Sequence, residues 1–271
     1  MPGERLRRAL SWRTMAPLAI LLILITALPA AKAQDGALET ILKSGVLRVG
    51  TTGDYIPFSI RDTAEGGFSG ADIDMVRGLG AALGVKVEFV STTWKTLLED
   101  FRAGRFDMVA GGVSVTTDRA DAGDFTIPLL EDGKRPIVRC ADREKFGSVD
   151  AIDQPSVRVT TNPGGTNERF ARDRLSHAQL IVWPDNRTIF EKIVDGTADV
   201  MVTDGTEVMQ QALRHPGILC PAAVQAPFTH FEKAYLLRRD PLFKRVVDSW
   251  LRTAIADGRW QKALDGAMRR P

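Results

Sequence analysis

The segments 101–107 (FRAGRFD) and 193–199 (IVDGTAD) share a Gly-x-x-Asp pattern between a helix-like and a strand-like stretch. The pair alone is weak evidence, but the order of elements around it also repeats. Strand-like and helix-like stretches alternate before and after the first segment: 46–50, 73–83, 85–90, 94–103 and 106–110. The same order recurs around the second: 157–159, 167–175, 179–182, 187–194 and 198–202. This repetition predicts a two-lobed α/β architecture.

Strands joined through helices form parallel sheets, and ligands bind beyond the carboxyl ends of such strands. Hydroxyl, amide, glycine and acidic residues follow the strands of both halves, and such residues suit a small polar ligand held between two lobes. In the first half they are Thr51, Thr52, Asp54, Tyr55, Thr93, Trp94, Gly111, Gly112 and Ser114. In the second they are Asn162, Gly164, Gly165, Thr166, Asn186, Thr203, Asp204 and Glu207.

The chain of 271 residues is 44% hydrophobic and 26% charged, which excludes disordered, collagen-like and coiled-coil proteins. Residues 1–33 contain four arginines, an uncharged run over 14–31 and the motif Ala31-Lys32-Ala33, which together predict a cleaved secretory signal peptide. An N-terminal membrane anchor is the alternative, because the run is just long enough to span a bilayer. We expect the first lobe to comprise 34–131 and 228–271, and the second 132–227.

The formal net charge of +2 changes sign when the signal is removed. Residues 1–33 carry five positive charges and one negative charge, so the remaining 238 residues have a net charge of −2. The basic balance therefore belongs to the export signal, and no basic stripe remains to suggest a nucleic-acid partner.

Cys140 and Cys220 are the only cysteines. Export would place them in an oxidising compartment, which favours a disulfide over two free buried thiols. His177, His215 and His230 lack the spacing of metal ligands, so we expect no metal and no cofactor. The sequence also lacks a nucleophile-elbow motif, a P-loop and a dinucleotide fingerprint.

Two segments are candidates for holding an anionic group. Arg119 follows a Ser/Thr-rich turn and is placed to bind a carboxylate with two parallel hydrogen bonds. The alternative is a surface arginine paired with Asp118 or Asp121. Residues 162–168 (NPGGTNE) precede a helix, where glycines admit a ligand and free N–H groups attract an anion. The alternative there is an ordinary turn with Thr166 or Asn167 as the N-cap.

Asp204 and Glu207 lie three residues apart after the last strand of the second half. On a helix they share one face, where mutual repulsion and burial would keep one carboxyl protonated as a general acid. The alternative is a capping box, with Asp204 as the N-cap and Glu207 in the first turn.

Four segments carry a family resemblance: 45–55, 162–172, 184–190 and 232–237. Through them the chain resembles the periplasmic amino-acid-binding proteins over nearly its whole length after the signal. The resemblance implies the type II solute-binding fold, with two α/β lobes, a hinge and an interlobe cleft. More narrowly, the chain resembles the cyclohexadienyl dehydratases built on that fold. Ordinary binders have Gly-Thr-Thr where this chain has Gly164-Gly165-Thr166, and the extra glycine enlarges the site.

The narrower resemblance implies a periplasmic lyase that converts prephenate to phenylpyruvate and arogenate to phenylalanine, with loss of water and CO2. It implies Glu207 as the general acid. The residues implied to bind substrate are Arg119, Thr116, Ser114, Asn162, Gly165, Thr166, Asp204, Trp94, Asp54 and Tyr55. Residues Gly205 and Thr206 depart from the larger apolar residues usual between the two acids, which leaves the orientation of Glu207 open.

Two other functions compete with this interpretation. One is a non-catalytic receptor that passes a polar amino acid to an ABC transporter, with Asp204 and Arg119 holding its ammonium and carboxylate groups. The other is an exported structural protein, which leaves the polar strand-end residues unexplained. We expect a small-molecule substrate as the partner and no stable membrane anchor after signal cleavage. The sequence leaves open whether the protein forms a homo-oligomer.

Overall fold

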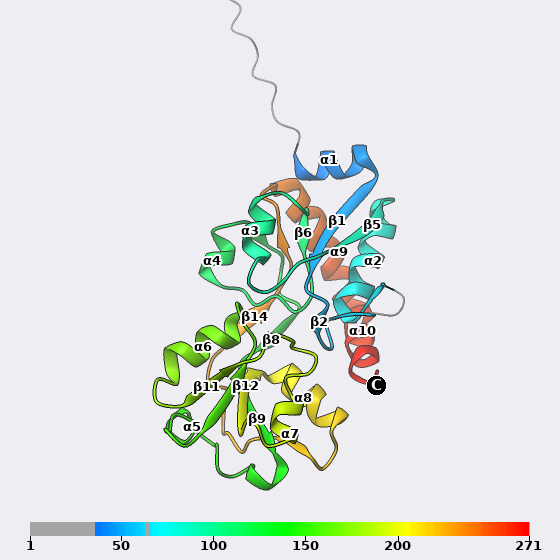
Figure 1. Ribbon diagram of the computed structural model, residues 1–271. Coiled ribbons are helices and arrows are strands. Elements are labelled where there is room, and N and C mark those ends of the chain that lie inside the picture. Colours follow the sequence, from blue (N-terminus) through cyan, green and yellow to red (C-terminus); the bar gives the residue numbers. More distant parts are fainter. Residues whose placement is uncertain (1–35, 63–65, 271) are drawn as a thin grey trace, which may run out of the picture. The chain divides into compact units, whose positions relative to one another are not determined.

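The computed structural model describes residues 36–62 and 66–270, so the expected signal peptide lies outside the described residues. The described residues form one compact unit that contains two five-stranded sheets. Figure 1 shows helices packed around each sheet. The chain passes between the sheets at β8 (Leu130–Asp132) and β14 (Phe231–Lys233), which pair antiparallel. None of the described helices is long and apolar enough to cross a membrane.

The first sheet has the strand order β5-β1-β6-β15-β7. β1 (Val46–Thr51) pairs parallel with β5 (Lys86–Ser91) and with β6 (Met108–Val109). β15 (Leu236–Leu237) returns from the second half of the chain and pairs antiparallel with β6 and with β7 (Asp124–Phe125). A small sheet of β2 (Asp54–Tyr55), β3 (Ser59–Arg61) and β4 (Phe68–Ser69) lies between β1 and the next helix in sequence.

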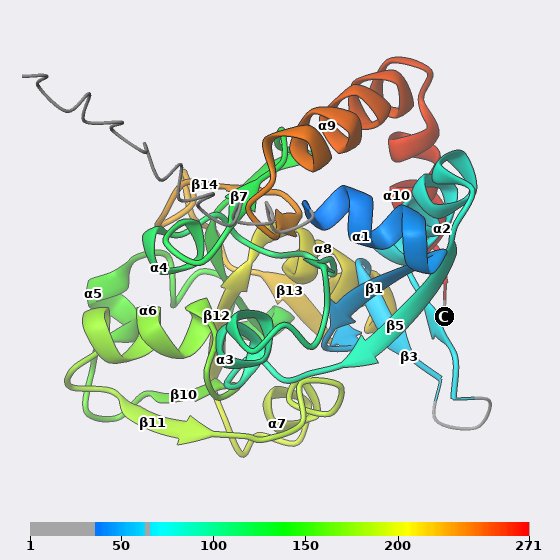
Figure 2. The same cartoon turned by 90° about the horizontal axis from the view of Figure 1, so that it is seen from above.

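The helices of the first lobe pack against the core through apolar residues at helical spacing. In α2 (Ala71–Leu83), Ile73, Val76 and Leu79 are buried, and Gly84 ends the helix in the left-handed conformation. In α9 (Pro241–Ala256), the Asp240 side chain accepts hydrogen bonds from two backbone N–H groups of the first turn. Figure 2 shows α9 beside α1 (Ala37–Ser44), and α10 (Arg259–Met268) beside α2. α3 (Leu97–Arg102) and α4 (Thr117–Ala120) complete this lobe.

The second sheet has the order β11-β10-β12-β9-β13. The strands β10 (Arg158–Thr161), β11 (Gln179–Val182) and β12 (Val200–Asp204) are parallel, while β9 (Lys134–Arg139) and β13 (Leu219–Pro221) run antiparallel to their neighbours. A disulfide joins Cys140, directly after β9, to Cys220 in β13. The helices and short turns around this sheet are η1 (Cys140–Asp142), α5 (Val149–Ile152), α6 (Thr166–Arg174), α7 (Glu191–Val194) and α8 (Gly205–Arg214).

The parallel parts of the two sheets, β5-β1-β6 and β11-β10-β12, have the same topology, which confirms the predicted two-lobed α/β fold. Two helices begin later than the apolar spacing suggested. The Thr93 hydroxyl accepts a hydrogen bond from the Thr96 N–H, and the Asp185 carboxylate accepts one from the Arg187 N–H. Each bond stabilises a turn that competes with the first turn of a helix. The antiparallel strands were not predicted.

The repeated Gly-x-x-Asp pattern forms the same ion pair in both lobes. Arg48 in β1 donates to Asp107 Oδ1 at 2.6 Å and to the Gly104 carbonyl at 3.0 Å. Arg158 in β10 donates to Asp199 Oδ1 at 2.6 Å and to the Gly196 carbonyl at 2.6 Å. Both glycines have positive φ, which other residues rarely adopt. The pattern therefore ties the loop before the third parallel strand to the first strand.

Replacing Asp199 by Asn should lower the free energy of unfolding at pH 7 by about 2 kcal/mol, because the carboxylate accepts charge-assisted bonds from Arg158 and Arg139. Burial raises the pKa of Asp199, but these bonds outweigh it and lower the pKa to about 2. The stabilisation is therefore present above about pH 4 and lost as the pH falls through 2. Urea unfolding across this pH range measures it.

Asp195→Asn is the matched control, because Asp195 pairs with Lys192 at the surface and its side chain is 45% exposed. Because solvent screens this exposed pair, Asp195→Asn should change stability much less than Asp199→Asn does. Equal effects of the two substitutions would contradict the structural role of the repeated pattern.

Candidate functional site

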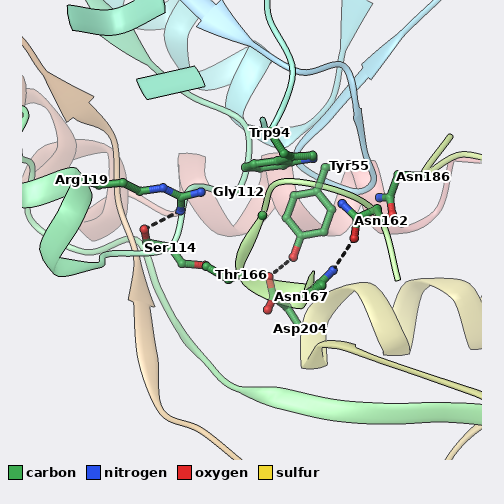
Figure 3. A pocket seen from close by; sticks show the side chains of 11 residues that line it. Tyr55, Trp94, Gly112, Ser114, Arg119, Asn162, Thr166, Asn167, Asn186 and Asp204 are labelled. Carbon is green, nitrogen blue, oxygen red and sulfur yellow. Dashed lines mark hydrogen bonds between the residues drawn. The ribbon is translucent and has the colours of Figure 1, made fainter. Parts of the chain in front are cut away.

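A cavity lies where the carboxyl ends of the parallel strands of both lobes meet. Figure 3 shows its side chains. Its lining consists of Tyr55, Trp94, Gly112, Ser114, Arg119, Asn162, Gly165, Thr166, Asn167, Asn186 and Asp204. Nine of these are strand-end residues singled out in the sequence, and the other two are Arg119, which was singled out separately, and Asn167, which was considered only as an N-cap. The strand-end residues Thr51, Thr52, Thr93, Gly111, Gly164 and Thr203 are not part of the lining.

The first lobe contributes an aromatic wall. The rings of Tyr55 and Trp94 meet edge to face with 5.6 Å between their centroids. The Trp94 indole N–H donates to Asp54 Oδ1 at 3.1 Å, so Asp54 orients this wall from outside the cavity lining. Burial raises the pKa of Asp54.

Arg119 in α4 is a buried cation without a carboxylate partner among the described residues. It is 7% exposed, donates to the Ser114 carbonyl at 2.8 Å, and lies with its guanidinium carbon 5.7 Å from the Trp94 ring centroid. Burial lowers its pKa to about 10. Asp118 pairs instead with Arg169 at 2.6 Å, so the alternative of a surface arginine paired with a neighbouring aspartate is wrong. Most donor positions of Arg119 remain available to an anion in the cavity.

The glycine-rich loop of the second lobe closes the cavity opposite Trp94. A Cβ at Gly165 would lie 3.7 Å from the Trp94 side chain, so a larger residue there would occupy ligand space. A Cβ at Gly164 would lie 2.4 Å from Lys95 Cα, so this glycine is needed where the lobes approach. Gly165 is the N-cap of α6. Thr116 lies outside the main cavity and lines an adjoining pocket with Arg119 and Gly165.

Asp204, at the end of β12, is buried and fully engaged by the protein itself. Lys134 donates to its Oδ1 at 2.5 Å, while Lys233 and the Tyr55 hydroxyl both donate to Oδ2. Burial acts to raise the pKa of Asp204, but the two lysine charges hold it well below its usual range. Asp204 is therefore a carboxylate whose charge is already balanced from both lobes.

Lys134 and Lys233 are the functional residues that sequence reasoning missed. Each is 2% exposed. Lys134 is the first residue of β9, just after the first passage between the lobes, and Lys233 is the last residue of β14, at the end of the second passage. Lys134 also donates to Thr166 Oγ1 at 2.9 Å, and Lys233 also donates to the Gly112 carbonyl at 2.8 Å and to Ser114 Oγ at 3.0 Å. Because lysine is almost never fully buried, the sequence offered no reason to expect these two residues inside the protein. The only signal was the family resemblance of segment 232–237, which contains Lys233.

The start of α8 is capped by Asp132 in β8, which accepts hydrogen bonds from the Gly205 and Thr206 N–H groups at 2.8 Å and 3.3 Å. Asp204 occupies the N-cap position, but its side chain makes no capping bond. The capping-box alternative for Asp204 and Glu207 is therefore wrong, because both carboxyl groups accept hydrogen bonds from other side chains.

Glu207 is buried directly behind the cavity and is 1% exposed. Its Oε1 accepts a hydrogen bond from Asn186 Nδ2 at 3.0 Å, and its Oε2 accepts one from Thr203 Oγ1 at 2.5 Å. Burial is the main cause that raises its pKa to about 8, and the charge of Asp204 raises it further. Asn186 lines the cavity and also donates to the backbone carbonyl of Asp54 in the other lobe at 2.9 Å. Asn186 therefore separates Glu207 from the cavity.

Among the described residues, no group of three or more His, Cys, Asp or Glu side chains could hold a metal ion. As far as the structure describes the chain, the site thus combines one guanidinium without a carboxylate partner, one balanced carboxylate and one carboxyl whose pKa of about 8 favours the protonated form at neutral pH. Such a site can bind a small anion and donate a proton to it.

Comparisons with known proteins agree with this geometry. Residues 47–267 match the family model "Bacterial extracellular solute-binding proteins, family 3". The chain is 49% identical over 234 residues to a cyclohexadienyl dehydratase of Pseudomonas aeruginosa, covering 86% of this chain and 87% of that protein. It is 28% identical over 178 residues to a probable amino-acid ABC transporter-binding protein of Haemophilus influenzae, covering 66% of this chain and 67% of that one.

One similar solved structure is an ancestral amino-acid-binding protein described as a precursor of cyclohexadienyl dehydratase, with 33% identity, a TM-score of 0.78, and coverage of 86% of this chain and 99% of that one. Another is an ancestral cyclohexadienyl dehydratase, with 45% identity, a TM-score of 0.54, and coverage of 88% of this chain and 98% of that one. The chain belongs to family 3 of the bacterial extracellular solute-binding proteins, with the two-lobed type II fold of that family.

Proposed function

We propose that this chain is a periplasmic cyclohexadienyl dehydratase that converts prephenate to phenylpyruvate and arogenate to phenylalanine. The observation that carries the proposal is Glu207, a buried carboxyl with a pKa raised to about 8 that lies behind a cavity lined by the Arg119 guanidinium. The 49% identity to the Pseudomonas aeruginosa dehydratase supports it. The family membership and the expected signal peptide support export to the periplasm.

Both reactions need an acid, because the ring hydroxyl leaves as hydroxide unless it is protonated. In the proposed step, bound substrate displaces the Asn186 amide that lies between Glu207 and the cavity. Glu207 then donates its proton to that hydroxyl, and the C–O bond breaks to release water. The bond between the ring and its carboxylate breaks as CO2 leaves, and its electron pair completes the aromatic ring. Glu207 is left as a carboxylate and recovers a proton from solvent before the next turnover. Its raised pKa keeps it protonated at neutral pH.

The charges around the cavity suit a substrate with two carboxylates. Arg119, Lys134 and Lys233 contribute three positive charges, Asp204 contributes one negative charge, and protonated Glu207 contributes none. The local balance of about +2 opposes the −2 of the chain without its first 33 residues and matches a dianion such as prephenate. We assign Arg119, with Ser114 and Thr116, to a substrate carboxylate, and Trp94 with Tyr55 to the ring.

A further set of residues borders the same space and would orient the other polar groups of the substrate. The glycine-rich loop contributes Asn162, Gly165 and Thr166. Asp204 accepts hydrogen bonds from Lys134 and Lys233 and so fixes the positions of their ammonium groups. Asp54 acts through Trp94 and through its backbone carbonyl, which accepts from Asn186.

A receptor for a polar amino acid is the second candidate, favoured by the shared fold and by the amino-acid-binding relatives. Such a receptor needs a carboxylate for the ligand ammonium. In this chain Asp204 is occupied by Lys134, Lys233 and Tyr55, which weighs against that use. A thermal-shift screen with amino acids, run beside a prephenate assay, separates the two candidates.

The mature protein should release phenylpyruvate from prephenate at pH 7, and Glu207→Gln should lower kcat by about 10²–10⁴-fold with little change in KM. The amide keeps the size of the side chain and removes the transferable proton. Phenylpyruvate absorbance after alkaline quenching measures the rate. Glu191→Gln, a substitution at a surface glutamate of α7 that is 57% exposed, is the control and should retain full activity. Absence of turnover together with a large thermal shift by an amino acid would support the receptor instead.

Arg119→Met should lower kcat/KM for prephenate by about 100-fold, mainly through KM, because it removes the charge-assisted bonds to a carboxylate. The methionine fills most of the same buried space beside Trp94. Arg172→Met is the control, because Arg172 is exposed on α6 and pairs with Glu168. An unchanged KM in Arg119→Met would rule out Arg119 as a substrate-binding residue.

A further inference from the structure

A chain of buried hydrogen bonds runs beneath the cavity from Lys134 through Asn167 and Thr203 to Glu207. Lys134 Nζ contacts Asn167 Oδ1, Asn167 Nδ2 lies 2.9 Å from Thr203 Oγ1, and Thr203 Oγ1 lies 2.5 Å from Glu207 Oε2. All four side chains are buried. Asn167 and Thr203 have no part in the substrate contacts or proton transfer described above.

The first link sets the direction of the whole chain. A lysine ammonium group can only donate, so the atom of Asn167 that it contacts must be the carbonyl oxygen. The amide nitrogen of Asn167 then faces the other way, where it donates to Asn162 Oδ1 at 3.0 Å and to Thr203 Oγ1 at 2.9 Å. This orientation of Asn167 follows from chemistry alone, because the reversed amide would set two donors against each other.

The direction continues to Glu207. Thr203 Oγ1 accepts from Asn167 and has a single hydrogen to donate, and Glu207 Oε2 is the acceptor at 2.5 Å. Asn186 supplies a second donor to Oε1. Both oxygens of the carboxyl therefore accept a hydrogen bond, an arrangement that stabilises the carboxylate formed after a proton has been given away.

We propose that Asn167 and Thr203 are positioning residues for Glu207, which they orient through a one-way chain of hydrogen bonds that begins at Lys134. The inference rests on the proposed function of Glu207 as the acid. Burial raises the pKa of Glu207, and the hydrogen bond that Thr203 donates at the end of the chain acts in the opposite direction. The other ionisable groups that face Glu207 are Asp204 at the start of its helix, Asp54 and Tyr55 from β2, and Lys134 from β9.

The neighbouring strand offers a matched control. Thr160 in β10 is fully buried like Thr203, but its hydroxyl has no hydrogen-bond partner among the described residues. Thr160→Val and Thr203→Val therefore make the same chemical change in adjacent parallel strands, and only one of them breaks the chain.

The test is a direct titration of Glu207 in the full mature protein. Glutamate side-chain carboxyls are labelled with 13C, the Glu207 resonance is identified by its absence in Glu207→Gln, and its chemical shift is followed from pH 5 to 10. Thr203→Val should raise the pKa of Glu207 by about one unit or more, because a charge-assisted donor is lost. Thr203→Ser should restore the original value, and Thr160→Val should leave it unchanged.

Asn167→Ala tests the next link. It should raise the pKa of Glu207 by less than Thr203→Val does, and it should add nothing in a Thr203→Val background, because both act through the same bond. An unchanged pKa in Thr203→Val, or additive effects of the two substitutions, would overturn the proposal. The titration needs no turnover, so a shifted pKa in a protein without dehydratase activity would refute the proposed function and leave the hydrogen-bond chain intact.

Discussion

Asp204 and Glu207 are both buried and lie one helical turn apart. The chemistry proposed for the cleft requires that one of these carboxyl groups is ionised while the other is protonated. Asp204 is ionised because Lys134, Lys233 and the Tyr55 hydroxyl converge on it. Glu207 accepts its hydrogen bonds from Asn186 and Thr203 instead, and burial with the adjacent charge of Asp204 raises its pKa to about 8. Two carboxyl groups whose pKa values are pushed apart are the usual sign of an acid matched with an electrostatic partner.

The fold supplies what this arrangement needs from both halves of the chain. The repeated ion pairs Arg48–Asp107 and Arg158–Asp199 fix the strands whose carboxyl ends carry the site. Lys134 lies opposite Asp204 on the neighbouring strand of the second sheet, whereas Lys233 reaches Asp204 from β14, at the second passage between the lobes. Tyr55 and Asn186 also make contacts from one lobe to the other, to Asp204 and to the Asp54 carbonyl. The ionised state of Asp204 therefore depends on groups from both lobes.

Much of this could be predicted from the sequence, for physical reasons. Apolar spacing and glycine stops locate α2 and the parallel strands, and the strand-end rule finds nine of the residues that line the cavity. The buried lysines could not be predicted, because a lysine becomes buried only when tertiary structure brings it a partner such as Asp204. Asn167 was missed for a similar reason: within its own segment it looks like an N-cap, and its contacts to Lys134 and Thr203 come from other strands. The division into lobes at residues 131/132 and 227/228 stays a prediction.

The central claim is that a buried, protonated Glu207 supplies the proton for loss of water, and the pH dependence of single-turnover prephenate conversion tests it most directly. Because the acidic form is the active one and the pKa of Glu207 is about 8, the rate constant should be constant from pH 6 to 7 and fall about tenfold per pH unit well above 8. The low residual rate of Glu207→Gln should lack this fall. A rate that stays constant up to pH 10, or one that already falls near the ordinary pKa of a glutamate, would contradict the account.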